Sequence, residues 1–402
     1  MYIDEVEIEV IMDKKKVILL RYGEIFLKGK NRNLFEKRLI ENIKKVLVGI
    51  EYKFIRTQNR YYIEDYQEYM QEEIIQRVTK VFGLHSLSIA TKVLTSYDNL
   101  KEAIVEYMPQ DGTFRVTTKR ADKRLDKNSM QISAMLGGYL LAQNMNLSVD
   151  LYYPKCEICV DIRENGYSYI FADKIDCAQG MPVGTAGRGM LLLSGGFDSP
   201  VAGYRMARRG MEIFGVHYHS YPHTSELARQ KVIDLAGKLT KYCGDIRLFV
   251  VKFTDIQQAI HEHCREDYMI TIMRRIMVEI AEKLALKFHC GALITGESLA
   301  QVASQTTRSI TVTNEAVKSL PIFRPLIGMD KYEIMDTAEK IDTYAISELP
   351  YEDCCTVFLP KNPVIKPDLE IAKKEQAKIV GLDKMIEEAI ESVEDLIIKA
   401  EY

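Results

Sequence analysis

The most informative segment of this 402-residue chain is Leu192-Leu193-Ser194-Gly195-Gly196-Phe197-Asp198-Ser199-Pro200. An apolar run leads into a Ser-Gly-Gly turn, after which Ser199 and Pro200 suit the N-cap and the first position of a helix. Glycines let a backbone approach an anion closely, and the free N–H groups of a helix N-terminus favour negative charge. The segment therefore predicts a phosphate-binding loop at the carboxyl end of a strand, where open α/β sheets bind ligands.

The sequence on either side of this loop alternates between strands and helices. Apolar runs of strand length lie at 190–193, 213–218, 248–251 and 292–295, and long helical patterns lie at 226–242 and 267–286. Such alternation is typical of a parallel sheet that is covered by helices on both faces. It predicts one α/β domain over residues 176–402.

The residues before 176 follow a mixed α+β pattern instead. A first module over residues 1–70 is predicted from a strand at 16–21, a helix at 33–47 and strands at 52–55 and 60–63. A second module over residues 71–175 is predicted from helices at 71–81, 100–107 and 129–141, strands at 87–95 and 113–119, and a hairpin of 156–163 with 167–170.

Composition places the chain among cytoplasmic globular proteins. Hydrophobic residues make up 47% and charged residues 28%, and no apolar run approaches the ~18 residues of a membrane span. The acidic start Met1-Tyr2-Ile3-Asp4-Glu5 lacks the basic region of a secretory signal. Eight cysteines without a regular framework are expected to be free thiols. We therefore expect no membrane partner.

Two basic windows lie in the N-terminal half, although the net charge of the whole chain is −3. The first contains Lys28, Lys30 and Arg32, and the second contains Arg115, Lys119, Arg120, Lys123 and Arg124. The C-terminal stretch 385–402 is acidic by contrast. This asymmetry fits a polyanion bound by one half of the protein, and two solvated faces are the alternative.

The loop at 194–199 is neither a Walker A loop nor the spaced-glycine dinucleotide fingerprint. It resembles the PP-loop, SGGxDS, of ATP pyrophosphatases, and all five fixed residues match. The resemblance implies cleavage of ATP between the α and β phosphates and adenylation of a substrate oxygen.

Further segments resemble the tRNA 4-thiouridine synthetases, the ThiI family. They are Arg21-Tyr22-Gly23-Glu24-Ile25, Lys28-Gly29-Lys30-Asn31-Arg32, Phe35-Glu36, Phe82-Gly83, Val116, Lys119-Arg120, Pro182-Val183-Gly184, the stretch 296–306 and the stretch 321–326. The resemblance covers essentially the whole chain. It implies a ferredoxin-like module, a THUMP domain that binds the acceptor end of tRNA, and a PP-loop domain, in that order.

The resemblance also implies a nucleotide site, position by position. Its residues would be Leu192, Leu193, Ser194, Gly195, Gly196, Asp198, Ser199, His217, Tyr218, Arg274, Gly296 and Gln305. Asp198 would orient Mg²⁺–pyrophosphate or the departing group, as a carboxylate near a divalent ion does.

The sulfur chemistry is expected at Cys354-Cys355. The family places a catalytic cysteine here. Cys354 aligns better with it than Cys355, which stays an alternative. The non-catalytic interpretation is that both are buried structural cysteines. Some members carry a rhodanese domain that receives persulfide sulfur, and this chain, which stops at Tyr402, is expected to resemble the form without it. A cysteine desulfurase is the family's sulfur source.

The implied function is ATP-dependent conversion of a tRNA uridine to 4-thiouridine. Uracil O4 would attack the α-phosphate of ATP, and sulfide or persulfide sulfur would then displace AMP. The resemblance alone implies a homodimer and a link to thiamine thiazole synthesis, which we expect to be weak or absent here. The alternatives are another PP-loop enzyme, such as a lysidine or 2-thiouridine synthetase or an amidotransferase-type ligase, and a non-catalytic RNA-binding protein. The intact Asp198 argues against the last.

Two metal-like patterns are discounted. Cys156-Glu157-Ile158-Cys159 has zinc or redox spacing, but no second such pair follows, and its alternation with Val160 predicts a strand. His217, His219 and His223 have no evident carboxylate or cysteine partner nearby. We therefore predict no dedicated metal site.

Overall fold

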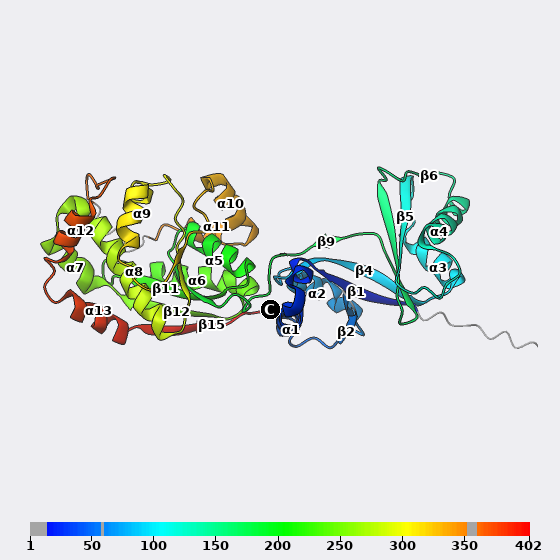
Figure 1. Cartoon of the computed structure of the whole chain (residues 1–402), viewed down its shortest axis with the longest axis horizontal. Helices are drawn as coiled ribbons and strands as arrows, with labels where there is room; N and C mark the ends of the chain where they lie inside the picture. Colours follow the sequence, from blue (N-terminus) through cyan, green and yellow to red (C-terminus); the bar gives the residue numbers. More distant parts are fainter. Residues whose placement is uncertain (1–13, 58–59, 352–359) are drawn as a thin grey trace, which may run out of the picture. The chain divides into compact units, whose positions relative to one another are not determined.

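A computed structural model describes residues 14–57, 60–351 and 360–402. By its internal contacts the chain divides into two compact units (Figure 1). The described part of unit 1 covers residues 14–23, 49–57, 60–79 and 84–179, and that of unit 2 covers residues 24–48, 80–83, 180–351 and 360–402. The three predicted domain ranges, 1–70, 71–175 and 176–402, stay predictions.

Unit 1 is built on one sheet with the strand order β2-β3-β1-β4-β8-β7-β5-β6, and β9 pairs with β4. Neighbouring strands are antiparallel, except that β5 is parallel to both β6 and β7. The strands are β1 (Lys15–Tyr22), β2 (Lys53–Thr57), β3 (Arg60–Glu64), β4 (Leu84–Leu94), β5 (Gly112–Arg120), β6 (Leu147–Val149), β7 (Cys156–Ile162), β8 (Tyr167–Phe171) and β9 (Ile175–Asp176).

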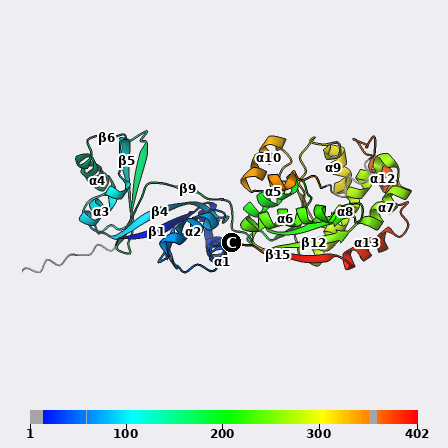
Figure 2. The ribbon, with the colours of Figure 1, turned by 180° about the vertical axis from the view of Figure 1, so that it is seen from behind.

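Helices cover part of this sheet. They are α2 (Gln71–Val78), α3 (Tyr97–Ile104) and α4 (Ser129–Gln143), with short 3-10 helices η2 (Glu68–Met70) and η3 (Val105–Tyr107). Leu100 of α3 and Leu136 of α4 share one buried cluster with Phe114 and Ile158 of the sheet. Figures 1 and 2 show α3 and α4 side by side; α4 packs on β5, whereas α3 packs on β4 and β8. Asn128 begins α4 with a capping box, since its side chain and that of Gln131 each accept from the other's backbone N–H.

Unit 2 contains a six-stranded sheet with the order β14-β13-β10-β11-β12-β15. Five strands are parallel, and β15 closes the edge antiparallel to β12. The strands are β10 (Arg188–Leu192), β11 (Glu212–His219), β12 (Ile246–Lys252), β13 (Ala292–Ile294), β14 (Ile322–Phe323) and β15 (Glu394–Ile398). The structure thus confirms the predicted parallel sheet and adds two short strands at its edges.

Helices pack on both faces of this sheet because neighbouring residues of a strand point to opposite sides. Met190 belongs to a buried cluster with Ile276 of α8, whereas a Cβ on Gly203 of α5 would meet Leu191 at 2.7 Å. The helices of unit 2 are α1 (Arg32–Val46), α5 (Asp198–Arg208), α6 (Glu226–Cys243), α7 (Thr254–His263), α8 (Met269–Lys287), α9 (Thr307–Asn314), α10 (Lys331–Lys340), α11 (Tyr344–Ser347), α12 (Leu369–Gln376) and α13 (Leu382–Glu391), with 3-10 helices η1 (Glu24–Asn31), η4 (Glu266–Tyr268) and η5 (Ala303–Gln305).

Two predicted details are wrong at the start of the helix after the loop. Pro200 is the third residue of that helix rather than its first. Ser199 is not the N-cap of the helix after the loop, because α5 begins at Asp198 and Phe197 precedes it without a side-chain cap. The Ser199 hydroxyl instead accepts a hydrogen bond from the backbone N–H of Ser194 at 2.9 Å. Its side chain therefore closes the loop rather than the helix.

Candidate functional site

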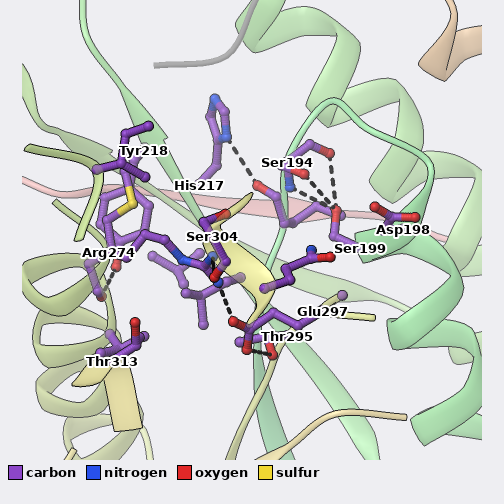
Figure 3. A pocket seen from close by; sticks show the side chains of 18 residues that line it. Ser194, Asp198, Ser199, His217, Tyr218, Arg274, Thr295, Glu297, Ser304 and Thr313 are labelled. Carbon is purple, nitrogen blue, oxygen red and sulfur yellow. Dashed lines mark hydrogen bonds and ion pairs between the residues drawn. The ribbon is translucent and has the colours of Figure 1, made fainter. Parts of the chain in front are cut away.

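The loop between β10 and α5 is held in a closed turn by two serines. Ser194 and Ser199 lie 3.1 Å apart at their hydroxyl oxygens, and the Ser199 hydroxyl also donates to the Ser194 carbonyl at 3.3 Å. Figure 3 shows these contacts at the wall of a cavity. The N-terminus of the 11-residue helix α5 follows directly, so its free N–H groups lie beside the turn.

The cavity next to this loop has a volume of about 290 Å³. Ten of the twelve residues predicted to bind nucleotide line it, and Gly195 and Gly196 are the two that do not. The ten are Leu192, Leu193, Ser194, Asp198, Ser199, His217, Tyr218, Arg274, Gly296 and Gln305. They come from the loop, from β11, from α8 and from the segment after β13, so the fold gathers residues far apart in the sequence.

Sequence reasoning missed the other eight lining residues. They are Val216, Ile270, Met277, Val278, Thr295, Glu297, Ser304 and Thr313. Four are aliphatic and are buried or partly buried, so they read as ordinary core. Glu297 and Ser304 lie in the stretch 296–306, which the family resemblance had marked without assigning them a role.

The side chains of β11 are anchored beside the loop. His217 is buried, and its Nδ1 lies 3.1 Å from the carbonyl oxygen of Leu193. The hydroxyl of Tyr218 donates to the carbonyl oxygen of Met277 on α8. These contacts tie β11 to the end of β10 and to α8, so the two residues form a fixed wall (Figure 3).

Asp198 presents a half-buried carboxylate at the start of α5. Burial raises the pKa of this carboxyl, while the Gln301 amide and the charge of Lys331 act in the opposite direction. Gln301 Nε2 donates to the two carboxylate oxygens at 3.3 and 3.5 Å. Because burial disfavours the charged form of this carboxyl, a cation bound beside it would stabilise the carboxylate.

Gly296 lets the segment after β13 approach the loop. A Cβ at this position would lie 2.8 Å from the backbone atoms of both Asp198 and Ser199. Real Cβ atoms do not come this close to backbone, so any side chain here must push the loop away.

We expect Gly296→Ala to weaken ATP binding at least ~10-fold and to lower the free energy of unfolding by roughly 1–3 kcal/mol. Titration calorimetry with ATP and thermal unfolding measure the two effects. Gly291→Ala is the matched control, because a Cβ there would come no closer than 3.9 Å to another atom. Wild-type ATP affinity in Gly296→Ala would contradict the packing argument.

Within the described ranges, no group of three or more His, Cys, Asp or Glu side chains could hold a metal ion. Cys156 and Cys159 lie on β7, as the alternation predicted, and burial raises the pKa of both thiols. Such thiols are poor nucleophiles and metal ligands at neutral pH. The predicted catalytic cysteines, Cys354 and Cys355, lie outside the described residues.

The basic residues of the second window have different surroundings. Arg120 donates to the carbonyls of Leu125 and Lys127 at 2.8 and 2.6 Å, so its guanidinium supports a loop. Arg115 pairs with Glu157 and Arg124 with Asp122. In the first window, Arg32 pairs with Glu36. The other two predicted RNA-binding residues of this window, Lys28 and Lys30, lie in the last turn of η1.

Lys119 lines a second cavity, of about 210 Å³, in unit 1. Arg21, Arg60, His85 and Lys174 also line it, against one acidic residue, Asp161. Burial, and then the charge of Arg60, lowers the pKa of Arg21 to about 10. The lowered pKa shows that burial and mutual repulsion disfavour the positive charge of Arg21. A bound anion would offset both effects, so this cavity favours an anionic ligand.

Among the described residues, none of the helices combines the length and apolar character that crossing a bilayer demands.

Comparisons with known proteins agree along nearly the whole chain. Residues 17–88 match the ThiI ferredoxin-like domain, residues 97–170 the THUMP domain and residues 184–380 the thiamine biosynthesis protein (ThiI) family. A probable tRNA sulfurtransferase of Alkaliphilus metalliredigens is 47% identical over 94% of this chain and 97% of its own length. The corresponding protein of Acetivibrio thermocellus is 47% identical over 96% of this chain and 99% of its own length.

A solved structure is similar over nearly the same length. The crystal structure of a 4-thiouridine synthetase–RNA complex with bound ATP superposes with a TM-score of 0.88 at 35% identity, and the match covers 96% of this chain and all of the other. Together with the sequence identities, this similarity confirms the predicted family. The chain belongs to the ThiI family of tRNA sulfurtransferases.

Proposed function

We propose that this enzyme uses ATP to adenylate a uridine in tRNA and then replaces its O4 with sulfur, giving 4-thiouridine. The observation that carries the proposal is the single cavity that joins the Ser194–Ser199 loop to His217, Tyr218, Arg274 and Gln305. A phosphate-binding turn and a wall suited to a nucleoside thus share one space.

The phosphates of ATP would lie against the loop and the start of α5. Backbone N–H groups and the helix dipole stabilise negative charge there without a cationic side chain. Gly196, which is exposed, leaves room beside Ser194 for the chain of phosphates. Arg274 adds a positive charge from the opposite wall (Figure 3).

The adenosine would occupy the more apolar part of the cavity. Val216, Ile270 and Met277 line that part, and burying an aromatic base against aliphatic side chains is favourable. Gln305 is buried, and its Oε1 has no hydrogen-bond partner within the described chain. A buried acceptor without a partner is costly, so it fits a donor such as an amino or hydroxyl group of the nucleoside.

Asp198 fits a Mg²⁺ ion that ATP brings with it. Mg²⁺ is usually held by one or two carboxylates together with substrate phosphates and water, so a single carboxylate beside the phosphate loop suffices. Bound there, the ion would neutralise charge on the departing pyrophosphate. Gln301 orients the carboxylate through both its oxygens.

Adenylation solves a leaving-group problem. When uracil O4 attacks the α-phosphate, pyrophosphate leaves and the C4–O4 bond becomes part of a phosphate ester. Hydrosulfide can then add to C4. AMP is the leaving group, and it takes the former O4 oxygen with it. A persulfide donor requires in addition a thiol that cleaves the new S–S bond.

We assign the sulfur-carrying thiol to Cys354 on the family resemblance, with a cysteine desulfurase as its source. A homodimer, which rests on the same resemblance, and a cytoplasmic location, which the composition favours, also belong to this proposal. We expect any link to thiamine thiazole synthesis to be weak or absent.

The RNA would contact unit 1 through its basic cavity. We expect Lys119→Ala to weaken tRNA binding about 3- to 10-fold and to reduce the slope of log K against log salt by about 1, because one phosphate contact is lost. Filter binding at several salt concentrations measures both. Lys101→Ala, which removes a partly exposed lysine of α3 outside the cavity, is the control. Equal effects of the two changes would refute this assignment.

The decisive test of the function is nucleoside mass spectrometry of unmodified tRNA incubated with the protein, ATP, Mg²⁺ and a sulfide or persulfide source. The proposal requires 4-thiouridine together with AMP and pyrophosphate. Cleavage of ATP to AMP and pyrophosphate without a thiolated base would retain the nucleotide site and reject the substrate. A different thiolated base would favour another tRNA-modifying PP-loop reaction.

A further inference from the structure

Glu297 connects three segments of unit 2 that are distant in the sequence. Its carboxylate follows β13 and accepts hydrogen bonds from Arg274 on α8, from Arg324 Nε after β14 at 2.7 Å, and from the Thr295 hydroxyl at 2.8 Å. The side chain is only 5% exposed. A buried carboxylate with three donors is a fixed point in the structure.

Arg274 is the member of this cluster that lines the cavity. One of its terminal nitrogens donates to Glu297, and the other donates to the carbonyl oxygen of Ser304 at 2.9 Å. Figure 3 shows the guanidinium held from both sides. Because Ser304 directly precedes Gln305, these contacts also tie Arg274 to the segment that carries Gln305.

The charges of the cluster explain why two arginines are present. Burial alone would raise the pKa of Glu297, but Arg274 and Arg324 outweigh it and hold that pKa below its usual range. Two guanidinium groups and one carboxylate leave a single positive charge. Arg324 is not among the residues that line the cavity and also donates to Asn314 Oδ1 at 3.3 Å, so the cavity receives this charge through Arg274.

We propose that Glu297 is a positioning residue of the nucleotide site: it fixes the guanidinium of Arg274 against the cavity, and Arg324 balances its charge. The inference rests on the proposed function, since it takes the cavity to bind ATP. It also gives a role to the family segments at 296–306 and 321–326, which meet at this carboxylate.

The test is Glu297→Gln, which keeps the shape of the side chain and removes its charge. We expect the Kd of ATP with Mg²⁺ to rise about 10- to 100-fold, because a misplaced binding group costs about this much. Titration calorimetry on the full chain measures the affinity, and thermal unfolding reports any general loss of structure. Glu297→Asp, which keeps the charge and shortens the reach, should lie between wild type and Glu297→Gln.

The matched control is Glu315→Gln. Glu315 pairs with Arg275, the next residue on α8, at 3.0 Å, and it does not line the cavity. The change removes the same charge from the neighbouring arginine. We expect unfolding to shift while the Kd of ATP stays within about twofold of wild type. An equal loss of ATP affinity in both variants would show a merely structural effect and overturn the inference.

A double-mutant cycle separates this inference from the function on which it rests. If Glu297 acts through Arg274, adding Glu297→Gln to Arg274→Ala should weaken ATP binding no further than about twofold. If the double variant instead weakens ATP binding by the product of the two single effects, the positioning role is rejected and the nucleotide site is retained. Unchanged ATP affinity in Arg274→Ala alone would show that this guanidinium does not act on the nucleotide, and it would overturn the inference. Should Glu297→Gln fail to fold, the cycle is run with Glu297→Asp.

Discussion

Asp198→Asn is expected to lower the rate of 4-thiouridine formation by about 10³-fold or more and, at neutral pH, to make the ligand-free protein more stable. The rate falls because an amide cannot hold the cation that accompanies the pyrophosphate or offset charge that develops in the transition state. The stability rises, by roughly 0.5–2 kcal/mol, because a charge that the fold buries without a full partner is removed.

The pH dependence gives this prediction its sign. Burial raises the pKa of Asp198 above its unfolded value, so the folded state binds the proton more tightly than the unfolded state does. The contribution of this carboxyl to stability is therefore fully present below the unfolded pKa and is lost as the pH rises through the folded pKa. The Asp198→Asn variant has no carboxyl at this position, so its stability should not fall in this way as the pH rises. Thermal unfolding of ligand-free protein between about pH 3 and pH 8 measures the difference.

Asp255→Asn is the control for the stability effect. Asp255 also lies in the first turn of a helix, α7, but it is exposed and does not line the cavity. Removing its charge loses a favourable interaction with the helix N-terminus and should lower stability slightly. A lower melting temperature in Asp198→Asn as well would mean that the carboxylate stabilises the ligand-free fold, contrary to our account.

Cys354→Ser is expected to reduce thiolation with a persulfide donor at least about 100-fold while ATP is still cleaved in the presence of tRNA. A hydroxyl cannot carry sulfane sulfur, whereas adenylation needs only the nucleotide site and uracil O4. Mass spectrometry of nucleosides and a pyrophosphate assay separate the two steps. Free sulfide at high concentration should partly restore 4-thiouridine, because it can attack C4 without a carrier.

Cys355→Ser is the matched variant, since it makes the same change one residue away. We expect it to retain most of the thiolation. If Cys355→Ser is inactive and Cys354→Ser is active, the assignment moves by one residue and the mechanism stays. If neither change affects thiolation, no thiol of this pair carries sulfur, and direct attack by sulfide would replace the proposed route.

The loop and the parallel sheet were predictable because their signals are local. An apolar strand, a Ser-Gly-Gly turn and a helix start follow one another between Leu192 and Pro200, and local order dictates local structure. The error at Ser199 arose because a serine near a helix start can bond forward as an N-cap or backward to a turn, and here the N–H of Ser194 is its partner. Only the folded turn decides between the two.

Features that depend on distant partners could not be predicted. The acidic stretch near the C-terminus contains the edge strand β15, in which Glu394 pairs with Arg229 and Asp395 with Arg247. The sequence shows the negative charges but not the arginines that meet them. Glu297 is similar, because its two guanidinium partners lie 23 and 27 residues away on either side. In both cases long-range pairing sets the role of the side chain.

The composition of unit 2 has a consequence for folding during synthesis. Helix α1 belongs to this unit. Its Leu39 lies close to Gly83 and Pro182, since a Cβ added to Gly83 would meet the side chains of both Leu39 and Pro182. Pro182 is made roughly 140 residues after α1. At about 5–20 residues per second, the ribosome needs roughly 7–30 s to cover that distance. During synthesis, Leu39 of α1 therefore stays without this partner until all of the sequence between them has been made.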